Sequence, residues 1–227
     1  MTDKPRFAVL LSGCGVFDGA EIHESVLTLL AIDRQGGVAR CFAPDRPQYH
    51  VIDHRSGQPT GETRNVLCES ARIARGAIDD LADFDPAAFD ALILPGGFGA
   101  AKNLCSFAID GADCAVDPTV ERALRAARAA GLAIGALCIA PVVLARVFGE
   151  GVLTIGSDAA TAEAITALGA HHQKATHAEV VVDRALRLVS SPCYMLDASI
   201  SQIAEGAENT VKALIALIGT NGQANQG

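Results

Sequence analysis

Short runs of aliphatic and β-branched residues recur along the chain, and longer segments with helical spacing of apolar residues separate most of them. The short runs predict β-strands, and the longer segments predict amphipathic helices. The predicted strands are residues 7–12, 38–43, 89–94, 132–137, 152–155 and 179–182. The predicted helices are residues 21–34, 62–75, 118–130, 140–148, 161–168 and 198–218.

This alternation of strands and helices predicts an α/β fold, a three-layer sandwich in which helices cover both faces of a mainly parallel sheet. Apolar runs without interruption, such as residues 91–94, suit strands that are buried on both faces. Residues 44–61 break the rhythm and predict a surface hairpin or loop insertion. We expect one domain, residues 1–219, followed by a polar flexible tail, residues 220–227.

Composition narrows the range of partners. The chain has 227 residues, half of them hydrophobic, and a formal net charge of -8. An acidic chain without a run of Lys and Arg repels nucleic acids and anionic membranes, so we expect neither as a partner. The apolar stretch at residues 7–11 is too short for a signal peptide or a membrane span. We therefore expect a cytoplasmic protein.

The cysteines predict neither disulfides nor a metal site. Their number is odd, no C-x-x-C pair occurs, and no histidine cluster lies at zinc spacing. We expect most of them to be small buried side chains. The seven are Cys14, Cys41, Cys68, Cys105, Cys114, Cys138 and Cys193.

Cys138 stands apart because of its local context. It directly follows the predicted strand 132–137 and precedes a helix with Pro141 in its first turn. Small neighbours such as Gly135 and Ala140 allow the sharp strand-to-helix turn of a nucleophile elbow. Because a helix N-terminus favours a thiolate, we expect the pKa of Cys138 to lie below the ordinary value of about 8.5.

Two glycine-containing loops should lie beside this turn, since ligands of open α/β sheets sit at the carboxyl ends of the strands. The loop Pro95-Gly96-Gly97 follows a buried strand, and its backbone N–H groups can face a ligand. Together with the N–H of Ile139, the N–H groups of these paired glycines could form an oxyanion hole for an adduct on Cys138. The loop of residues 12–15 follows the first strand, and we expect Gly13 and Cys14 to line the same cavity.

The first predicted helix carries a candidate acid/base. Asp18 can cap this helix, and Glu21 can close a capping box. Glu24 lacks such a structural role, because its helical neighbours Leu27 and Ala31 form an apolar stripe. A partly buried carboxylate without a cationic partner has a raised pKa, which suits a general acid/base.

The helix with Glu24, the loop with Gly96 and Gly97, and the Cys138 turn follow one another along the chain. Together they resemble the PfpI/ThiJ superfamily, a branch of the flavodoxin-like, class I glutaminase-like fold. Residues 11–24, 41–45 and 95–104 more specifically resemble the ElbB family of isoprenoid-biosynthesis-associated glyoxalases, and the likeness runs from about Arg6 to Ile218. By the superfamily pattern, Cys138 matches the nucleophile and Glu24 the carboxylate that hydrogen-bonds it. Gly97 and Ile139 match the oxyanion-hole positions.

The resemblance implies a weak, cofactor-free and metal-free glyoxalase of the lyase class. Its substrate would be a small reactive aldehyde, with glyoxal converted to glycolate and methylglyoxal to lactate. It also implies a homodimer. One departure is that many superfamily members have a catalytic histidine where this chain has Ser157 and Asp158. Catalysis would then depend on Glu24 and on backbone donors.

Alternatives remain open at the sequence level. Gly13, Gly15 and Gly19 do not have the spacing of a dinucleotide-binding fingerprint. A glutaminase-type amidohydrolase is a stronger rival, because His177 and Glu179 have the H-x-E spacing of a glutaminase base and its orienting carboxylate. A third alternative is a redox sensor or stress protein without real turnover, in which the activated thiol is oxidised.

Overall fold

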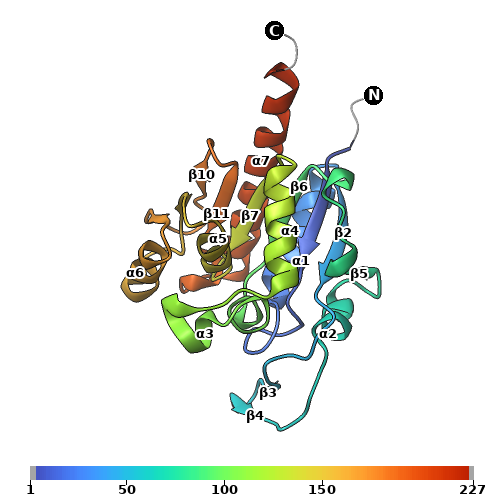
Figure 1. Ribbon diagram of the computed structural model, residues 1–227, viewed down its shortest axis with the longest axis vertical. Coiled ribbons are helices and arrows are strands. Elements are labelled where there is room, and N and C mark those ends of the chain that lie inside the picture. Colours follow the sequence, from blue (N-terminus) through green and yellow to red (C-terminus); the bar gives the residue numbers. More distant parts are fainter. Residues whose placement is uncertain (1–3, 225–227) are drawn as a thin grey trace.

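The computed structural model describes residues 4–224, which form an α/β sandwich with a seven-stranded sheet as its middle layer (Figure 1). All neighbouring strands are parallel except β10 (Val181–Asp183) and β11 (Leu188–Ser191), which form an antiparallel pair at one edge of the sheet. The predicted α/β fold with a mainly parallel sheet is therefore confirmed. In sheet order the strands are β10 (Val181–Asp183), β11 (Leu188–Ser191), β7 (Ala133–Leu137), β6 (Ala91–Leu94), β1 (Arg6–Leu10), β2 (Val38–Ala43) and β5 (Ile78–Asp80).

Two hydrophobic cores lie on opposite faces of this sheet. Phe7 and Val9 of β1 pack into the core that includes α1 and α7, whereas Ala8 and Leu10 pack into the core that includes α4 and α5. This alternation follows from the period of two in a strand, and it explains why a strand buried on both faces is apolar throughout. The helices are α1 (Ile22–Arg34), α7 (Ile200–Ala224), α4 (Pro118–Ala129) and α5 (Pro141–Phe148).

Smaller elements complete the described chain. The antiparallel hairpin of β3 and β4 projects from the body at the bottom of Figure 1, as predicted for residues 44–61. The remaining helices and strands are α2 (Val66–Ile73), α3 (Phe107–Asp110), α6 (Ala159–Ala167), β3 (Ile52–Asp53), β4 (Gln58–Pro59), β8 (Val152–Leu153) and β9 (His171–His172). Single helical turns lie at Leu81–Asp83, Pro86–Ala88, Ala100–Leu104, Gly111–Asp113 and Cys193–Met195.

Several elements differ from their sequence-based predictions. The strand predicted at residues 152–155 is short and pairs with β9 in a separate two-stranded sheet. The strands β5 and β11 were not predicted, because each is short and contains polar residues. The helix α2 begins at Val66, since the side chain of Asn65 accepts a hydrogen bond from the N–H of Cys68 and caps the helix there.

The C-terminal helix extends further than the sequence predicts. The helix α7 continues to Ala224 and so includes part of the segment for which we expected a polar tail. Residues 225–227, the end of that predicted tail, lie outside the described residues. Between residues 4 and 224 there is no helix both long and apolar enough to cross a membrane.

The strand order brings the three predicted loops together. β1, β6 and β7 are neighbours in the sheet, and their carboxyl ends carry the loop of residues 12–15, the loop of residues 95–97 and Cys138. The chain first builds the sheet outward from β1 through β2 to β5, and then continues on the other side of β1 with β6. Such a reversal opens a crevice at the carboxyl ends of the strands.

Candidate active site

Cys138 occupies a strained turn between β7 and α5. Its φ is +58°, in the left-handed region that residues other than glycine rarely adopt. Its backbone N–H donates to the carbonyl of Ser191 at 2.9 Å, which fixes the turn against β11. The residue is only 7% exposed. Strain of this kind clusters at functional sites, where the surrounding structure holds the residue in place.

Gly96 allows the close approach of two side chains from distant parts of the sequence. A Cβ at this position would lie 2.4 Å from Cβ of Cys138 and 2.7 Å from Oε2 of Glu24. Any larger residue would therefore push the thiol and the carboxyl apart. The N–H of Gly96 also donates to Oε2 of Glu24 at 2.9 Å.

Glu24 lies in the first turn of α1 and is completely buried. Its Oε1 accepts a hydrogen bond from the N–H of Tyr194 at 3.1 Å, and its carboxyl also hydrogen-bonds the Cys138 thiol. Burial raises the pKa of Glu24 to about 7, and the charge of Glu21 acts in the same direction, against the lowering effect of the backbone N–H donors. A carboxyl with this pKa can both accept and release a proton near neutral pH.

The pKa predicted for Cys138 is corrected by the structure. Burial raises the pKa of the Cys138 thiol well above its ordinary value, and the charge of Glu24 raises it further. The N–H groups of Gly97 and Ile139 hydrogen-bond the sulfur and act in the opposite direction, but their effect is smaller. The raised pKa favours the protonated thiol in the free protein, and the carboxyl of Glu24 is hydrogen-bonded to it.

The cavity in front of Cys138 has a volume of about 400 Å³. Of the side chains that the structure describes, none that lines this cavity carries a charge. Most of the lining side chains are apolar, and the backbone N–H groups of Gly97 and Ile139 hydrogen-bond the sulfur of Cys138. The lining residues are Val16, Gly97, Phe98, Ala101, Phe107, Ala108, Cys138, Ile139, Thr161, Tyr194 and Met195.

Gly13 and Cys14 do not line this cavity, contrary to our expectation. The N–H of Gly13 donates to the hydroxyl of Ser70 on α2 at 2.8 Å, so it is not directed at Cys138. Burial raises the pKa of the Cys14 thiol, and the charged groups that act on it include Glu69 and Arg72 of α2. The loop therefore turns toward α2, on the far side of β1 from Cys138.

Asp18 serves the loop rather than the helix. Glu21 caps α1, since its carboxylate accepts a hydrogen bond from the N–H of Glu24 at 2.7 Å, so the predicted capping role of Asp18 is wrong. The buried carboxylate of Asp18 instead accepts a hydrogen bond from the N–H of Ile52 at 2.7 Å. Asp18 thereby attaches the β3–β4 hairpin to the loop that carries Val16, one wall of the cavity.

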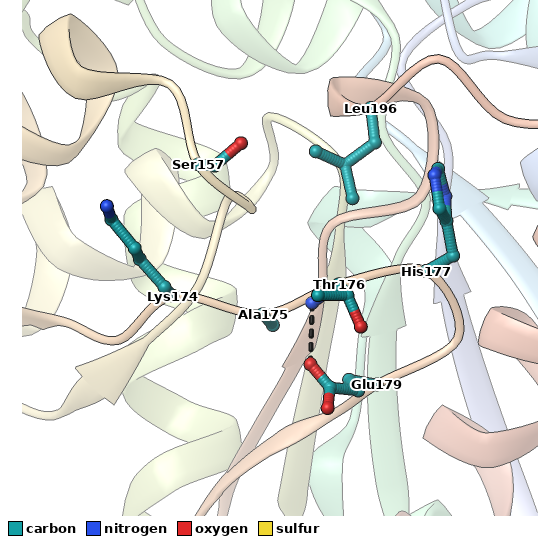
Figure 2. Close-up of a pocket in the computed structure, with 7 residues that line it drawn as sticks. All are labelled: Ser157, Lys174, Ala175, Thr176, His177, Glu179 and Leu196. Atoms are coloured by element: carbon teal, nitrogen blue, oxygen red, sulfur yellow. Dashed lines mark hydrogen bonds between the residues drawn. The ribbon is translucent and has the colours of Figure 1, made fainter.

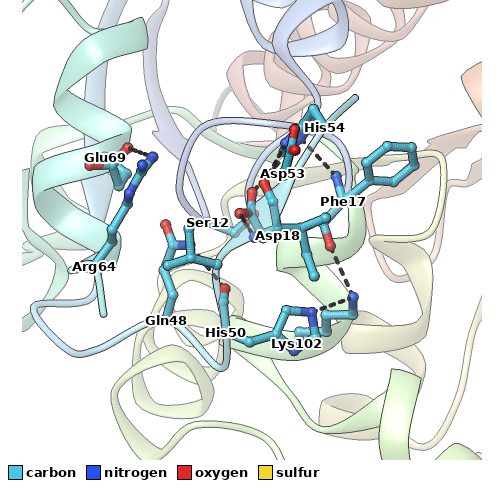
Figure 3. Close-up of polar contacts among 12 residues, drawn as sticks. Ser12, Phe17, Asp18, Gln48, His50, Asp53, His54, Arg64, Glu69 and Lys102 are labelled. Carbon is cyan, nitrogen blue, oxygen red and sulfur yellow. Dashed lines mark hydrogen bonds and ion pairs between the residues drawn. The ribbon is translucent and has the colours of Figure 1, made fainter. Parts of the chain in front are cut away.

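Further polar contacts fasten this hairpin to the cavity rim, and no motif in the sequence indicates them (Figure 3). His54 accepts a hydrogen bond from the N–H of Phe17 at 3.2 Å. The Lys102 ammonium donates to the carbonyl of Phe17 at 2.9 Å and to the ring of His50 at 3.2 Å. Lys102 also lies 4.8 Å from the ring centre of Phe98, which forms part of the cavity wall.

His177 and Glu179 lie at a different hollow, of about 320 Å³, together with Ser157 (Figure 2). None of the residues that line this hollow also lines the cavity at Cys138. The carboxylate of Glu179 accepts a hydrogen bond from the N–H of Thr176 at 2.6 Å and points away from His177. The H-x-E spacing therefore does not assemble a base with Cys138.

The segment after β11 contributes to the site, and the sequence analysis did not predict this contribution. Tyr194 supplies a backbone donor to Glu24 and also lines the cavity. Cys193 beside it is buried and has a φ of +41°, a second strained cysteine. The only available signal was the short apolar run at residues 188–189 before Pro192, which is too weak to predict a strand.

Comparison with known proteins identifies similar chains over nearly the full length. No family model matches the chain. It is 49% identical over 224 residues to the human protein named glutamine amidotransferase-like class 1 domain-containing protein 3, mitochondrial, covering 94% of this chain and 84% of the relative. It is 35% identical, with a TM-score of 0.87, to the crystal structure of an isoprenoid biosynthesis protein with an amidotransferase-like domain from Ehrlichia chaffeensis, covering 93% of this chain and 99% of that one.

More distant structures share the fold alone. Glyoxalase III from Candida albicans is 13% identical with a TM-score of 0.61, and the alignment covers 94% of this chain and 97% of that one. The comparisons also correct the expected location. The human relative and the ES1 proteins of Rattus norvegicus and Danio rerio are all named as mitochondrial proteins, so the prediction of a cytoplasmic protein is wrong.

Proposed function

Because this chain belongs to the family of the glutamine amidotransferase-like class 1 domain and ES1 proteins, we propose that it is a cofactor-independent glyoxalase of the ElbB type. It would convert glyoxal to glycolate and methylglyoxal to lactate through a covalent adduct on Cys138. The observation that carries this proposal is the buried pair of Cys138 and Glu24, which are joined by a hydrogen bond next to the backbone donors of Gly97 and Ile139.

The first step forms the bond between sulfur and carbon. The Glu24 carboxylate takes the thiol proton as the sulfur attacks an aldehyde carbon, because the thiol is otherwise protonated. The electron pair of the carbonyl moves to its oxygen, beside the N–H groups of Gly97 and Ile139. Return of a proton to this oxygen gives a neutral hemithioacetal.

The second step moves a proton between the two substrate carbons. Glu24 removes the proton from the hemithioacetal carbon, which gives an enediolate, and then delivers that proton to the neighbouring carbon. The hydroxyl proton on the first carbon moves to the oxygen of the second, so that the first carbon becomes the thioester carbonyl. The product of this transfer is a thioester with a hydroxymethyl group. Water hydrolyses the thioester, so that glycolate leaves and the Cys138 thiol is restored. The overall reaction consumes one glyoxal and one water, with no external oxidant or reductant.

The site supports glutamine hydrolysis less well. Glutamine carries a charged ammonium and a charged carboxylate, and among the described side chains none that lines the cavity could pair with either. Burying unpaired charges is costly. His177 and Glu179, the candidate base and its partner, lie at the other hollow.

A redox sensor is also less well supported. Oxidation by peroxide requires a thiolate that is accessible to solvent. Cys138 is 7% exposed, and burial raises the pKa of its thiol. Both properties slow oxidation at Cys138. Addition to an aldehyde does not require a preformed thiolate, because Glu24 can take the thiol proton as the sulfur attacks.

The homodimer implied by the resemblance also remains a proposal. Three apolar side chains on α1, Ile22, Val26 and Leu30, are between 36% and 47% exposed and share one helical face. Burial of this face against a second copy would remove apolar surface from water. Sedimentation of the wild type and of Val26→Asp tests this proposal, and a monomeric wild type would contradict it.

Turnover of glyoxal tests the proposed function directly. The assay follows glyoxal consumption and glycolate release by the wild type and by Cys138→Ser, with ammonia release from glutamine measured in parallel. We expect glycolate from the wild type alone and no ammonia from either protein. Glycolate formation that survives in Cys138→Ser, or ammonia release by the wild type alone, would contradict the proposal.

A further inference from the structure

The walls of the Cys138 cavity are mainly apolar over most of their extent. Besides Tyr194, seven lining residues have aliphatic, aromatic or thioether side chains, and they come from four separate parts of the chain. The apolar lining residues are Val16, Phe98, Ala101, Phe107, Ala108, Ile139 and Met195. Such a surface gains free energy when it covers the apolar part of a ligand.

The two hydroxyl groups in the lining are already hydrogen-bonded elsewhere. The hydroxyl of Tyr194 contacts Nδ1 of His23 at 2.8 Å. The side chain of Thr161 hydrogen-bonds the carboxylate of Asp158, which also accepts from the N–H of Thr161. Each hydroxyl keeps a lone pair that can accept, but the polar groups that lie next to the reacting carbon are the sulfur of Cys138 and the two N–H groups beside it.

The size of the cavity also exceeds what the smallest aldehyde fills. Its volume of about 400 Å³ lies within the range of about 300–1,000 Å³ that is typical of pockets for larger organic ligands. Glyoxal would occupy only the end at Cys138. It would leave the apolar walls covered by water, with no gain from their burial.

We propose that the preferred substrate of this site is a 2-oxoaldehyde that carries an apolar substituent, either a branched alkyl group or an aryl ring. The aldehyde reacts at Cys138, and the substituent packs against the apolar walls of the cavity, which include Val16 and Met195. This inference rests on the proposed glyoxalase function and specifies the substrate class of the same site. It requires no further chemical step, because the substituent takes no part in bond formation.

The test compares kcat/KM for glyoxal, methylglyoxal, isopropylglyoxal and phenylglyoxal with the purified full chain. Burial of each further methylene contributes about fourfold in kcat/KM, so we expect at least about a tenfold preference for the two larger aldehydes over methylglyoxal. Release of the corresponding 2-hydroxy acid is measured for each substrate. Cys138→Ser serves as the background for all four.

Two wall variants and one matched control locate the origin of the preference. Val16→Thr and Met195→Gln keep the approximate shape of a wall residue but add a polar group. Each should lower the preference for phenylglyoxal over methylglyoxal by about threefold to tenfold. Val38→Thr is the same change as at Val16, at a half-exposed position at the amino end of β2, and should leave the preference unchanged. Each aldehyde is hydrated in water to the same extent whichever variant is assayed. This effect therefore cancels when the kcat/KM preference of one variant is divided by that of another.

The outcomes separate this inference from the function on which it rests. A preference for the larger aldehydes that falls in the two wall variants and persists in Val38→Thr supports the inference. Turnover of glyoxal or methylglyoxal that equals or exceeds that of the larger aldehydes overturns it, while the glyoxalase function stands. If one wall variant fails to fold, the other wall variant still gives a ratio in which the hydration of each aldehyde cancels. Absence of turnover above the Cys138→Ser background for every aldehyde overturns both.

Discussion

Glu24 couples the stability of the fold to pH, and Glu24→Gln removes this coupling. The pKa of Glu24 is about 7 in the folded protein, against 4.5 as its ordinary value. Because the folded pKa is the higher one, the linked stability is fully present below pH 4.5 and is lost as pH rises through about 7. At about 1.4 kcal/mol per pKa unit, the whole effect amounts to about 3 kcal/mol.

Urea unfolding at pH 5 and at pH 8, at equal ionic strength, measures most of this effect. From pH 5 to pH 8 the wild type should lose about 2–3 kcal/mol more of its unfolding free energy than Glu24→Gln. The Cys138 thiol does not disturb the comparison, because its raised pKa keeps it protonated over this range. Gln leaves one of the N–H groups of Gly96 and Tyr194 without a good acceptor, which costs about 1–3 kcal/mol. This cost is present at both pH values and cancels in the difference.

A matched variant controls for the loss of one carboxyl group. Glu163→Gln removes an exposed carboxyl from α6 and should retain the pH dependence of the wild type. If Glu24→Gln instead shows the same loss between pH 5 and pH 8 as the wild type, the Glu24 carboxyl does not ionise in this range. The reasoning about its burial would then be refuted.

Three further predictions concern catalysis and the loops around the site. For glyoxal, kcat/KM should rise with pH to a plateau with a midpoint of about 7, the pKa of Glu24, and a pH–rate profile of Glu24→Gln should lack this rise. Gly96→Ala should lower the unfolding free energy by about 1–3 kcal/mol and abolish turnover; Gly219→Ala, where no atom lies within 4 Å of the new Cβ, should do neither in parallel melts and assays. Asp18→Ala removes the acceptor for the N–H of Ile52 and should speed tryptic cleavage at Arg55 in the hairpin, and an unchanged cleavage rate would contradict that role.

The sequence was sufficient to predict the framework of the site. The buried runs of β1, β6 and β7 identified the strands, and the rule that ligands sit at their carboxyl ends placed Cys138 near the loop with Gly96 and Gly97. Glu24 could be singled out because its carboxyl faces an apolar helical stripe. These inferences depend on local periodicity and on topology, which the sequence records directly.

Other features depend on three-dimensional packing and could not be predicted. The raised pKa of Cys138 reflects burial and the nearby Glu24 carboxyl, which together outweigh the effect of a helix N-terminus. The orientation of Cys14 depends on its flanking glycines Gly13 and Gly15, whose φ angles of +114° and +129° turn the loop toward α2. The N–H of Tyr194 is brought to Glu24 by the position of β11, the strand that precedes it. That strand ends in two buried serines, a residue type that is more typical of loops.

The most direct measurement of the central claim follows protein mass and product together in Glu24→Gln. After glyoxal is added, intact-protein mass spectrometry detects an adduct on Cys138, while chromatography measures released glycolate. In this variant water must take the thiol proton in place of Glu24, so the adduct should form slowly and then accumulate with the mass of one glyoxal, while little glycolate is released. The double variant Glu24→Gln/Cys138→Ser should form no adduct. Glycolate release at the wild-type rate would contradict the account, and loss of both adduct and product would place Glu24 only in activation of the thiol.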